Sequence, residues 1–127
     1  MELKTLNEIE IISAPHSKIS EVDFENLTFG NVFTDHMLVC DYVDGAWQKP
    51  VIEPYAPFMI DPSAKVFHYG QAIFEGMKAY KDEQDDVWLF RPDENYHRFN
   101  KSATRMAMPE VPEDIFLGGL HRLLEIE

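Results

Sequence analysis

The sequence predicts an α+β fold, in which a mainly antiparallel sheet is packed by helices. Short runs rich in strand-forming residues fill much of 33–91, and turn signals separate them. From Pro92 onward, apolar residues instead recur at helical spacing. Strands joined by tight turns become antiparallel neighbours, and helices that follow a run of strands pack against the sheet.

The strand predictions rest on composition and on turns. The run FTDHMLVCDYV favours a strand, Asp44-Gly45 is a hairpin signal, and Pro50 ends the next strand. The four prolines in 50–63 predict an irregular segment with one short strand. The polar loop DEQDD predicts a second hairpin. The expected strands are 33–43, 46–50, 57–60, 77–81 and 87–91.

Between these strands, the stretch VFHYGQAIFEGMKAYK (66–81) predicts a short strand, about two helical turns and another strand. Gly76 is the expected C-cap of the helical turns, because glycine readily adopts the left-handed conformation that ends many helices.

Two helices are predicted after the strands. Pro92 suits a first helical position, and Asp93 and Glu94 favour the positive end of the helix dipole. This helix is expected to run to about Met106, and a second one over 112–126. The predicted buried stripe of the first helix contains Tyr96, Phe99, Ala103, Met106 and Ala107.

Length and charge suggest the organisation of the chain and exclude some partners. The 127 residues suit one domain, which we expect over 29–127. Residues 1–28 are expected to form an N-terminal arm or cover segment, or a short first strand around Ile9–Ile12. Lys and Arg number 11 against 23 Asp and Glu, a net charge of −12. This balance argues against nucleic acids and anionic membranes as partners.

The sequence lacks the features of disulfide-bonded, metal-binding, membrane-spanning and secreted proteins. Cys40 is the single cysteine, so an intrachain disulfide and a cysteine-based zinc site are excluded, and His16, His97 and His121 lack metal-ligand spacing. We therefore expect no metal. No apolar run has the length of a membrane span, and the acidic start does not resemble a signal peptide. A cytoplasmic location is the expectation.

Three arginines, Arg91, Arg98 and Arg105, follow one another at intervals of seven residues. On a helix they would lie near one line. One interpretation is an anion site, because guanidinium groups bind phosphate or carboxylate through two parallel hydrogen bonds. The other is a solvated face with salt bridges to nearby acidic residues. Similarly, Tyr69 could present its hydroxyl to a ligand or lie in the core.

Three strings indicate a family. FGNVFTDHML (29–38), FHYGQAIFEGMKAYK (67–81) and LFRPDENYHRFNKSATRM (89–106) resemble branched-chain amino acid aminotransferases, which are fold-type IV pyridoxal-phosphate enzymes. The resemblance implies the smaller N-terminal domain of a two-domain subunit, in a homodimer that holds pyridoxal 5′-phosphate between the domains. The family's Schiff-base lysine belongs to the larger domain, and no lysine of this chain occupies a matching motif. We therefore expect no catalytic residue here, and no activity from this fragment alone.

Four residues match positions of known role in the family. Arg98 matches the arginine that binds the cofactor phosphate, and Phe29 and Phe74 match walls of the apolar substrate pocket. Tyr69 matches a tyrosine that reaches into the partner subunit's substrate pocket. Arg91 and Arg105 have no such match and are interpreted as structural.

The implied reaction moves the amino group of Leu, Ile or Val to 2-oxoglutarate. A related fold-type IV enzyme, such as a D-amino-acid aminotransferase or an aminodeoxychorismate lyase, is an alternative that FTDHML and FEGMKAY disfavour. A non-catalytic, stand-alone binding domain is an alternative of a different class. The chain stops at LEIE within a helical pattern, which fits a piece of a longer protein but also a natural domain end.

Overall fold

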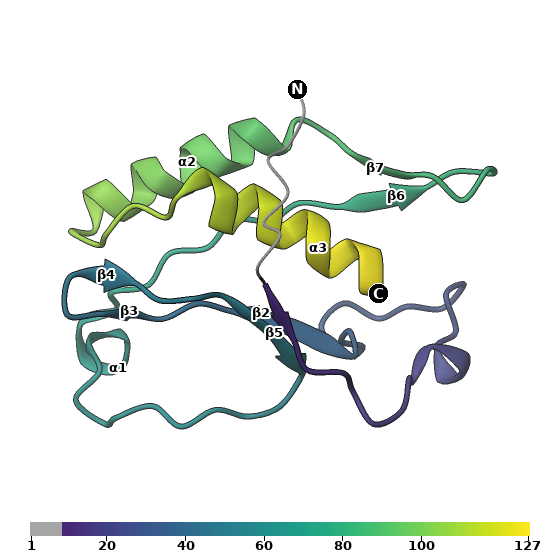
Figure 1. Ribbon diagram of the computed structural model, residues 1–127, viewed down its shortest axis with the longest axis horizontal. Coiled ribbons are helices and arrows are strands. Elements are labelled where there is room, and N and C mark those ends of the chain that lie inside the picture. Colours follow the sequence, from purple (N-terminus) through teal and green to yellow (C-terminus); the bar gives the residue numbers. More distant parts are fainter. Residues whose placement is uncertain (1–8) are drawn as a thin grey trace. The chain divides into compact units, whose positions relative to one another are not determined.

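The computed structural model describes residues 9–127, and its short strands and helices confirm the α+β class (Figure 1). The described residues form two compact units. One contains the residues up to Phe58 together with Gly118–Glu127, and the other is Met59–Leu117. The boundary expected near residue 28 stays a prediction.

A three-stranded sheet forms the centre of the first unit. Strand β5 (Val51–Pro54) lies between β1 (Glu10–Ile11), which is parallel to it, and β2 (His36–Val39), which is antiparallel. Leu38 is opposite Ile52, and Ile52 is completely buried. The predicted first strand is therefore confirmed as β1, and its parallel pairing is an exception to the mainly antiparallel pattern.

A hairpin extends from this sheet. Strands β3 (Tyr42–Val43) and β4 (Ala46–Trp47) pair in antiparallel register. Between them, Asp44 has φ 50° and Gly45 has φ 82°. Positive φ at both central residues is typical of the type I′ turn, whose twist matches that of the strands. The hairpin predicted from Asp44-Gly45 is confirmed.

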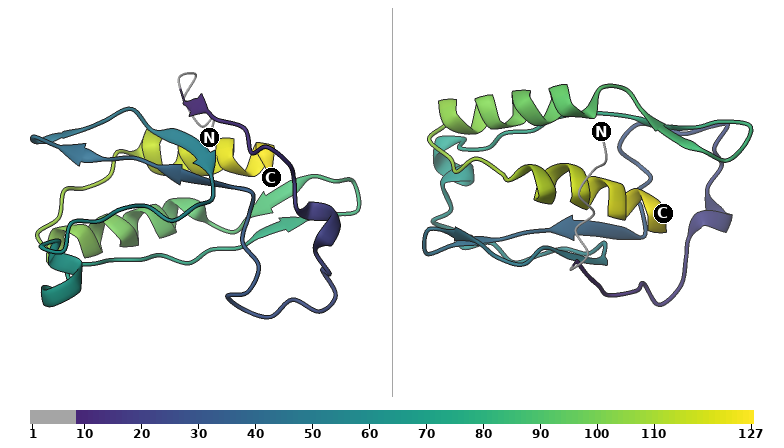
Figure 2. Two further views of the ribbon diagram at one scale, coloured as in Figure 1. Left: turned by 90° about the horizontal axis from the view of Figure 1, so that it is seen from below. Right: turned by 45° about the horizontal axis from the view of Figure 1, so that its top comes forward.

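The C-terminal helix α3 (Gly119–Ile126) packs on β2, and the two lie side by side in both sets of views (Figures 1 and 2). The Glu127 carboxylate accepts hydrogen bonds from the backbone N–H groups of Asp35 and His36. The His36 ring bridges further: Nε2 accepts from the Ala14 N–H, so Nδ1 carries the proton and donates to Glu127 at 2.7 Å.

The second unit is built around the long helix α2 (Pro92–Arg105). A short helix α1 (Lys65–Tyr69) and the hairpin of β6 (Ala79–Lys81) and β7 (Val87–Leu89) precede it, and a π-helical turn, η2 (Asp114–Gly118), follows. An exposed 3₁₀ turn, η1 (Ile19–Glu21), belongs to the first unit.

The core of the second unit lies along α2. Ala103 is completely buried, and the rings of Tyr96 and Phe99 pack on Phe116. The buried Asn100 fastens the loop after the helix, because its amide donates to the Val111 carbonyl and accepts from the Val111 N–H. α2 begins at Pro92, as predicted, and Arg91 before it has φ 49°.

Several sequence predictions were wrong. The described strands form three small sheets rather than one. The ladder breaks between β4 and β5 at Gln48–Pro50, where Pro50 has no N–H to donate. No strand forms at 57–60; instead, Val51–Pro54 form β5.

The predicted helix ends and caps also need correction. The helical turns before β6 lie at 65–69 rather than after Gly70, and Gly70 is their left-handed C-cap, with φ 60°. Gly76 caps no helix and lies in a segment that belongs to no helix or strand. Ala107 is exposed because α2 has already ended at Arg105. The second predicted helix is divided into the η2 turn and α3.

Candidate functional site

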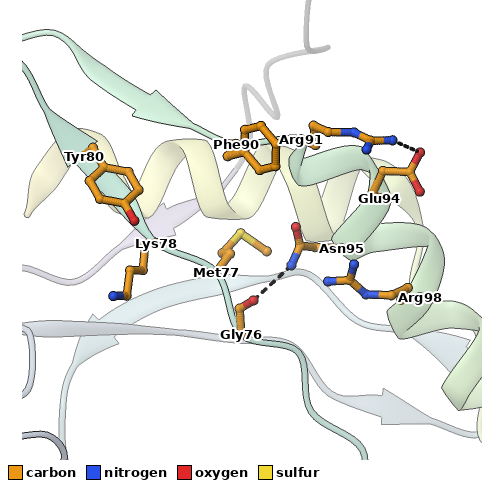
Figure 3. Close-up of a pocket in the computed structure, with 9 residues that line it drawn as sticks. All are labelled: Gly76, Met77, Lys78, Tyr80, Phe90, Arg91, Glu94, Asn95 and Arg98. Atoms are coloured by element: carbon orange, nitrogen blue, oxygen red, sulfur yellow. Dashed lines mark hydrogen bonds and ion pairs between the residues drawn. The ribbon is translucent and has the colours of Figure 1, made fainter.

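The candidate site is a pocket of about 340 Å³ in the second unit (Figure 3). One side consists of the segment that leads into β6, and the other of the first turns of α2 and the residues just before them. The lining residues are Gly76, Met77, Lys78, Tyr80, Phe90, Arg91, Glu94, Asn95 and Arg98.

Helix α2 contributes polar groups to the pocket from one side. Residues three and four apart lie on the same helix face, so Glu94, Asn95 and Arg98 are neighbours there. Pro92 at the first helical position sets where this face begins. In Figure 3 the Arg98 guanidinium reaches from α2 toward Gly76 and Met77.

Glu75 binds the Arg98 side chain at two points. Arg98 Nε donates to one Glu75 carboxylate oxygen at 2.8 Å, and Nη2 donates to the other at 2.8 Å. The Glu75 side chain is only 14% exposed, whereas that of Arg98 is 60% exposed. A paired fork of this kind is the strongest common geometry between guanidinium and carboxylate.

Asn95 extends the network beneath this pair. It is 6% exposed, and its Nδ2 donates both to Glu75 Oε2 and to the Gly76 carbonyl at 3.0 Å. The Asn95 side chain thereby ties α2 to the Glu75–Gly76 segment.

The ion pair shifts the protonation equilibria of both partners. Hydrogen bonding from Arg98 is the main cause that lowers the pKa of Glu75; burial opposes it, and the Asn95 hydrogen bond adds to it. The pKa of Arg98 is raised by the Glu75 carboxylate. Both groups are therefore charged near neutral pH.

The contacts of Arg91 and Arg98 fit both interpretations of the three arginines. Arg91 pairs with Glu94 at 2.9 Å and Arg98 with Glu75, as the salt-bridge interpretation predicts. However, a guanidinium has five N–H donors, and Glu75 accepts from two of those of Arg98. The remaining three form a second edge, which no described residue bonds, so the pair is compatible with an anion site.

Phe74 and Tyr69 lie away from this pocket. Segment 71–78 belongs to no helix or strand, and its residues alternate between half-buried odd positions and exposed even ones. Glu75 therefore faces inward, and Phe74, 90% exposed, lines a second hollow of about 790 Å³ beside Arg105 and Met106. Tyr69 ends α1 and is 81% exposed.

Phe29 belongs to the first unit and is fully exposed. Among the four residues singled out from the sequence, the structure therefore joins only Arg98 to a network of polar contacts.

Sequence reasoning missed Glu75 and Asn95. Glu75 stands inside the string FEG, but nothing local to that string indicates a partner 23 residues away.

Neither a metal-binding cluster nor a membrane-spanning helix is found among the described residues. Among residues 9–127, no group of three or more His, Cys, Asp or Glu side chains is arranged to hold a metal ion. No helix within the same range has both the length and the apolar character needed to cross a membrane.

Relatives of known name match most of the chain. Branched-chain-amino-acid transaminase 1 of Bacillus subtilis is 52% identical over 106 residues, or 83% of this chain and 30% of that protein. Branched-chain-amino-acid aminotransferase 2 of the same organism is 48% identical over 112 residues, or 87% and 31%. Branched-chain-amino-acid aminotransferase of Mycolicibacterium smegmatis is 44% identical over 110 residues, or 86% and 30%.

The chain thus spans about 30% of the length of these relatives. No family model matches it. The identities confirm the resemblance carried by the three strings, which lie at positions 29–106.

Proposed function

The chain belongs to the branched-chain amino acid aminotransferase family, and we propose that it is the smaller, N-terminal domain of such an enzyme. The full-length enzyme would transfer the amino group of Leu, Ile or Val to 2-oxoglutarate with pyridoxal 5′-phosphate. The observation that carries this proposal is the identity of about half the matched residues to proteins named for this activity.

The pocket beside α2 fits one end of the cofactor. A phosphate dianion needs fixed, permanently charged donors, and the second edge of Arg98 offers them in a pocket that Lys78 also lines. Arg98 would hold the phosphate, and Asn95 would keep α2 attached to the segment that carries Glu75. When bound, the cofactor supplies the electron sink for amino-group transfer.

The apolar side chain of the substrate would meet Phe29 and Phe74. Both are exposed in this chain, as residues that meet a ligand or another part of an assembly would be. Tyr69 would reach the substrate pocket of the partner subunit, in a homodimer of fold-type IV. We place the enzyme in the cytoplasm, because a chain with one cysteine forms no intrachain disulfide and so needs no oxidising compartment.

The test is amino transfer by the full-length protein. With pyridoxal phosphate and 2-oxoglutarate, L-leucine, L-isoleucine and L-valine should each yield glutamate, whereas D-alanine and aminodeoxychorismate should not react. Reaction with either of the last two would favour the related fold-type IV enzymes, and no reaction with any substrate would favour a binding domain.

The chain as printed provides a second test, because it carries no lysine in a motif that matches the family's cofactor-binding lysine. With leucine, 2-oxoglutarate and pyridoxal phosphate, it should form no glutamate above the background of the free cofactor. Turnover by the pure chain would contradict the placement of that lysine in the larger domain.

A further inference from the structure

We propose that Glu75 is a positioning residue, which orients the Arg98 guanidinium so that its second edge faces a phosphate group in the pocket. This inference rests on the proposed function, since it assumes that Arg98 binds the cofactor phosphate. It adds a residue whose carboxylate acts through Arg98 and does not itself touch the cofactor.

The first argument is the geometry of the fork. A single hydrogen bond would leave the guanidinium plane free to rotate, but bonds from both Nε and Nη2 to the two Glu75 oxygens fix its plane and direction. The free edge, formed by Nη1 and Nη2, is then held in one orientation. A donor that is already oriented loses less entropy when it binds.

The second argument is that Glu75 is itself held in place. Its side chain is mostly buried, and it accepts a further hydrogen bond from Asn95, which is anchored at the Gly76 carbonyl. Asn95 is among the few buried polar residues of the described chain. The Gly76 carbonyl therefore holds Asn95, Asn95 holds Glu75, and Glu75 in turn holds the more exposed Arg98.

The negative charge of Glu75 acts against phosphate binding, whereas its orientation of Arg98 favours it. A carboxylate beside an anion site repels the anion, so by charge alone the neutral variant Glu75→Gln would bind phosphate more tightly. If orientation dominates, the same variant binds phosphate more weakly, because glutamine offers one oxygen in place of two and an N–H group faces the guanidinium. The direction of change decides between the two.

The experiment measures the phosphate contribution to binding in the full-length protein freed of cofactor. The dissociation constants of pyridoxal 5′-phosphate and of pyridoxal are determined by absorbance titration. The constant of pyridoxal divided by that of pyridoxal 5′-phosphate isolates the contribution of the phosphate, and this ratio falls when phosphate binding weakens. We expect Glu75→Gln to lower this ratio about tenfold, as removal of a partner that orients a binding group does elsewhere. An unchanged or increased ratio would overturn the proposal.

Three variants make the result specific. Asp93→Asn removes an exposed carboxylate of α2 that does not line the pocket, and it should not lower the ratio. Arg98→Ala should lower it, and failure to do so would count against the proposed function as well. In an Arg98→Lys background, where the fork is absent, Glu75→Gln should have little further effect; a full tenfold loss there would show that Glu75 acts independently of Arg98.

Discussion

Gly119 and Leu38 are packed so closely that a side chain at position 119 would require the Leu38 side chain to move. A Cβ atom built on Gly119 would lie 2.5 Å from Leu38 Cδ2, with Cδ1 and Cγ at 3.5 and 3.6 Å. This contact lets the first residue of α3 approach β2 directly. Glycine here serves close packing rather than a turn.

We predict that the effect of Gly119→Ala on the free energy of unfolding depends on residue 38 and changes sign when Leu38 is replaced. In the wild type it should destabilise the protein by about 1 kcal/mol, because an overpacking cost of about 1–3 kcal/mol outweighs the helix propensity of up to about 1 kcal/mol that alanine regains. In a Leu38→Ala background the clash is gone, and the same change should stabilise. Urea denaturation of the four proteins measures both effects, and a stabilising effect in the wild type would contradict the packing argument.

For Arg98 we predict a loss of cofactor retention in the full-length enzyme. Arg98→Ala should raise the dissociation constant of pyridoxal phosphate about 10- to 150-fold, the range for a hydrogen bond to a charged group. Arg98→Lys should recover part of this, since it keeps the charge but not the fork. Arg105→Ala is the matched control, and equal losses in Arg105→Ala and Arg98→Ala would contradict a specific role for Arg98.

Tyr69→Phe should separate function from stability. Tyr69 is 81% exposed, so loss of its hydroxyl should change the free energy of unfolding by no more than about 0.5 kcal/mol. If the hydroxyl reaches the partner subunit's substrate pocket, kcat/KM for the branched-chain substrates should fall. Thermal melts and steady-state kinetics test this together; a lower Tm with unchanged kinetics would make Tyr69 a packing residue.

Asn100 should matter for stability far more than an exposed asparagine. Asn100→Ala removes both hydrogen bonds to Val111 and leaves the partly buried Val111 N–H and carbonyl without these partners, which costs about 1–3 kcal/mol. The control is Asn26→Ala, since Asn26 bonds the exposed Asp23. Similar unfolding free energies for the two variants would show that the loop is held by other contacts.

Acid should weaken the β6–β7 hairpin through Asp82. Its carboxylate accepts from Trp88 Nε1 and from the N–H groups of Gln84 and Asp86, and the Trp88 bond is the main cause that lowers the pKa of Asp82. Because the pKa of Asp82 is lowered in the folded state, the ionised carboxylate stabilises the fold at pH values above the ordinary pKa of about 4. This stabilisation is lost as the pH falls below that value and the carboxylate becomes protonated.

Trp88 fluorescence between pH 7 and 2 should therefore change as Asp82 becomes protonated, with a midpoint below about 4. Asp82→Asn should abolish this change, whereas Asp93→Asn, at an exposed position of α2, should preserve it. A transition that persists in Asp82→Asn would assign it to another carboxylate.

Local features were predictable from the sequence because neighbouring residues determine them. Asp44-Gly45 allows positive φ at two successive positions, and that alone favours the turn between β3 and β4. Pro92, with acidic residues after it, marks the start of α2 for equally local reasons. The three strings within 29–106 indicated the family because such a resemblance is a property of the order of residues along the chain and does not depend on the fold.

The tertiary structure decided which distant groups meet. The helical turns before β6 end at Gly70, which has φ 60°, rather than at Gly76. Arg98 was a candidate from its spacing alone, but its partner Glu75 depends on segment 71–78, which turns alternate side chains toward α2. A pairing across 23 residues depends on how the elements pack, and no dihedral preference of the intervening residues encodes it.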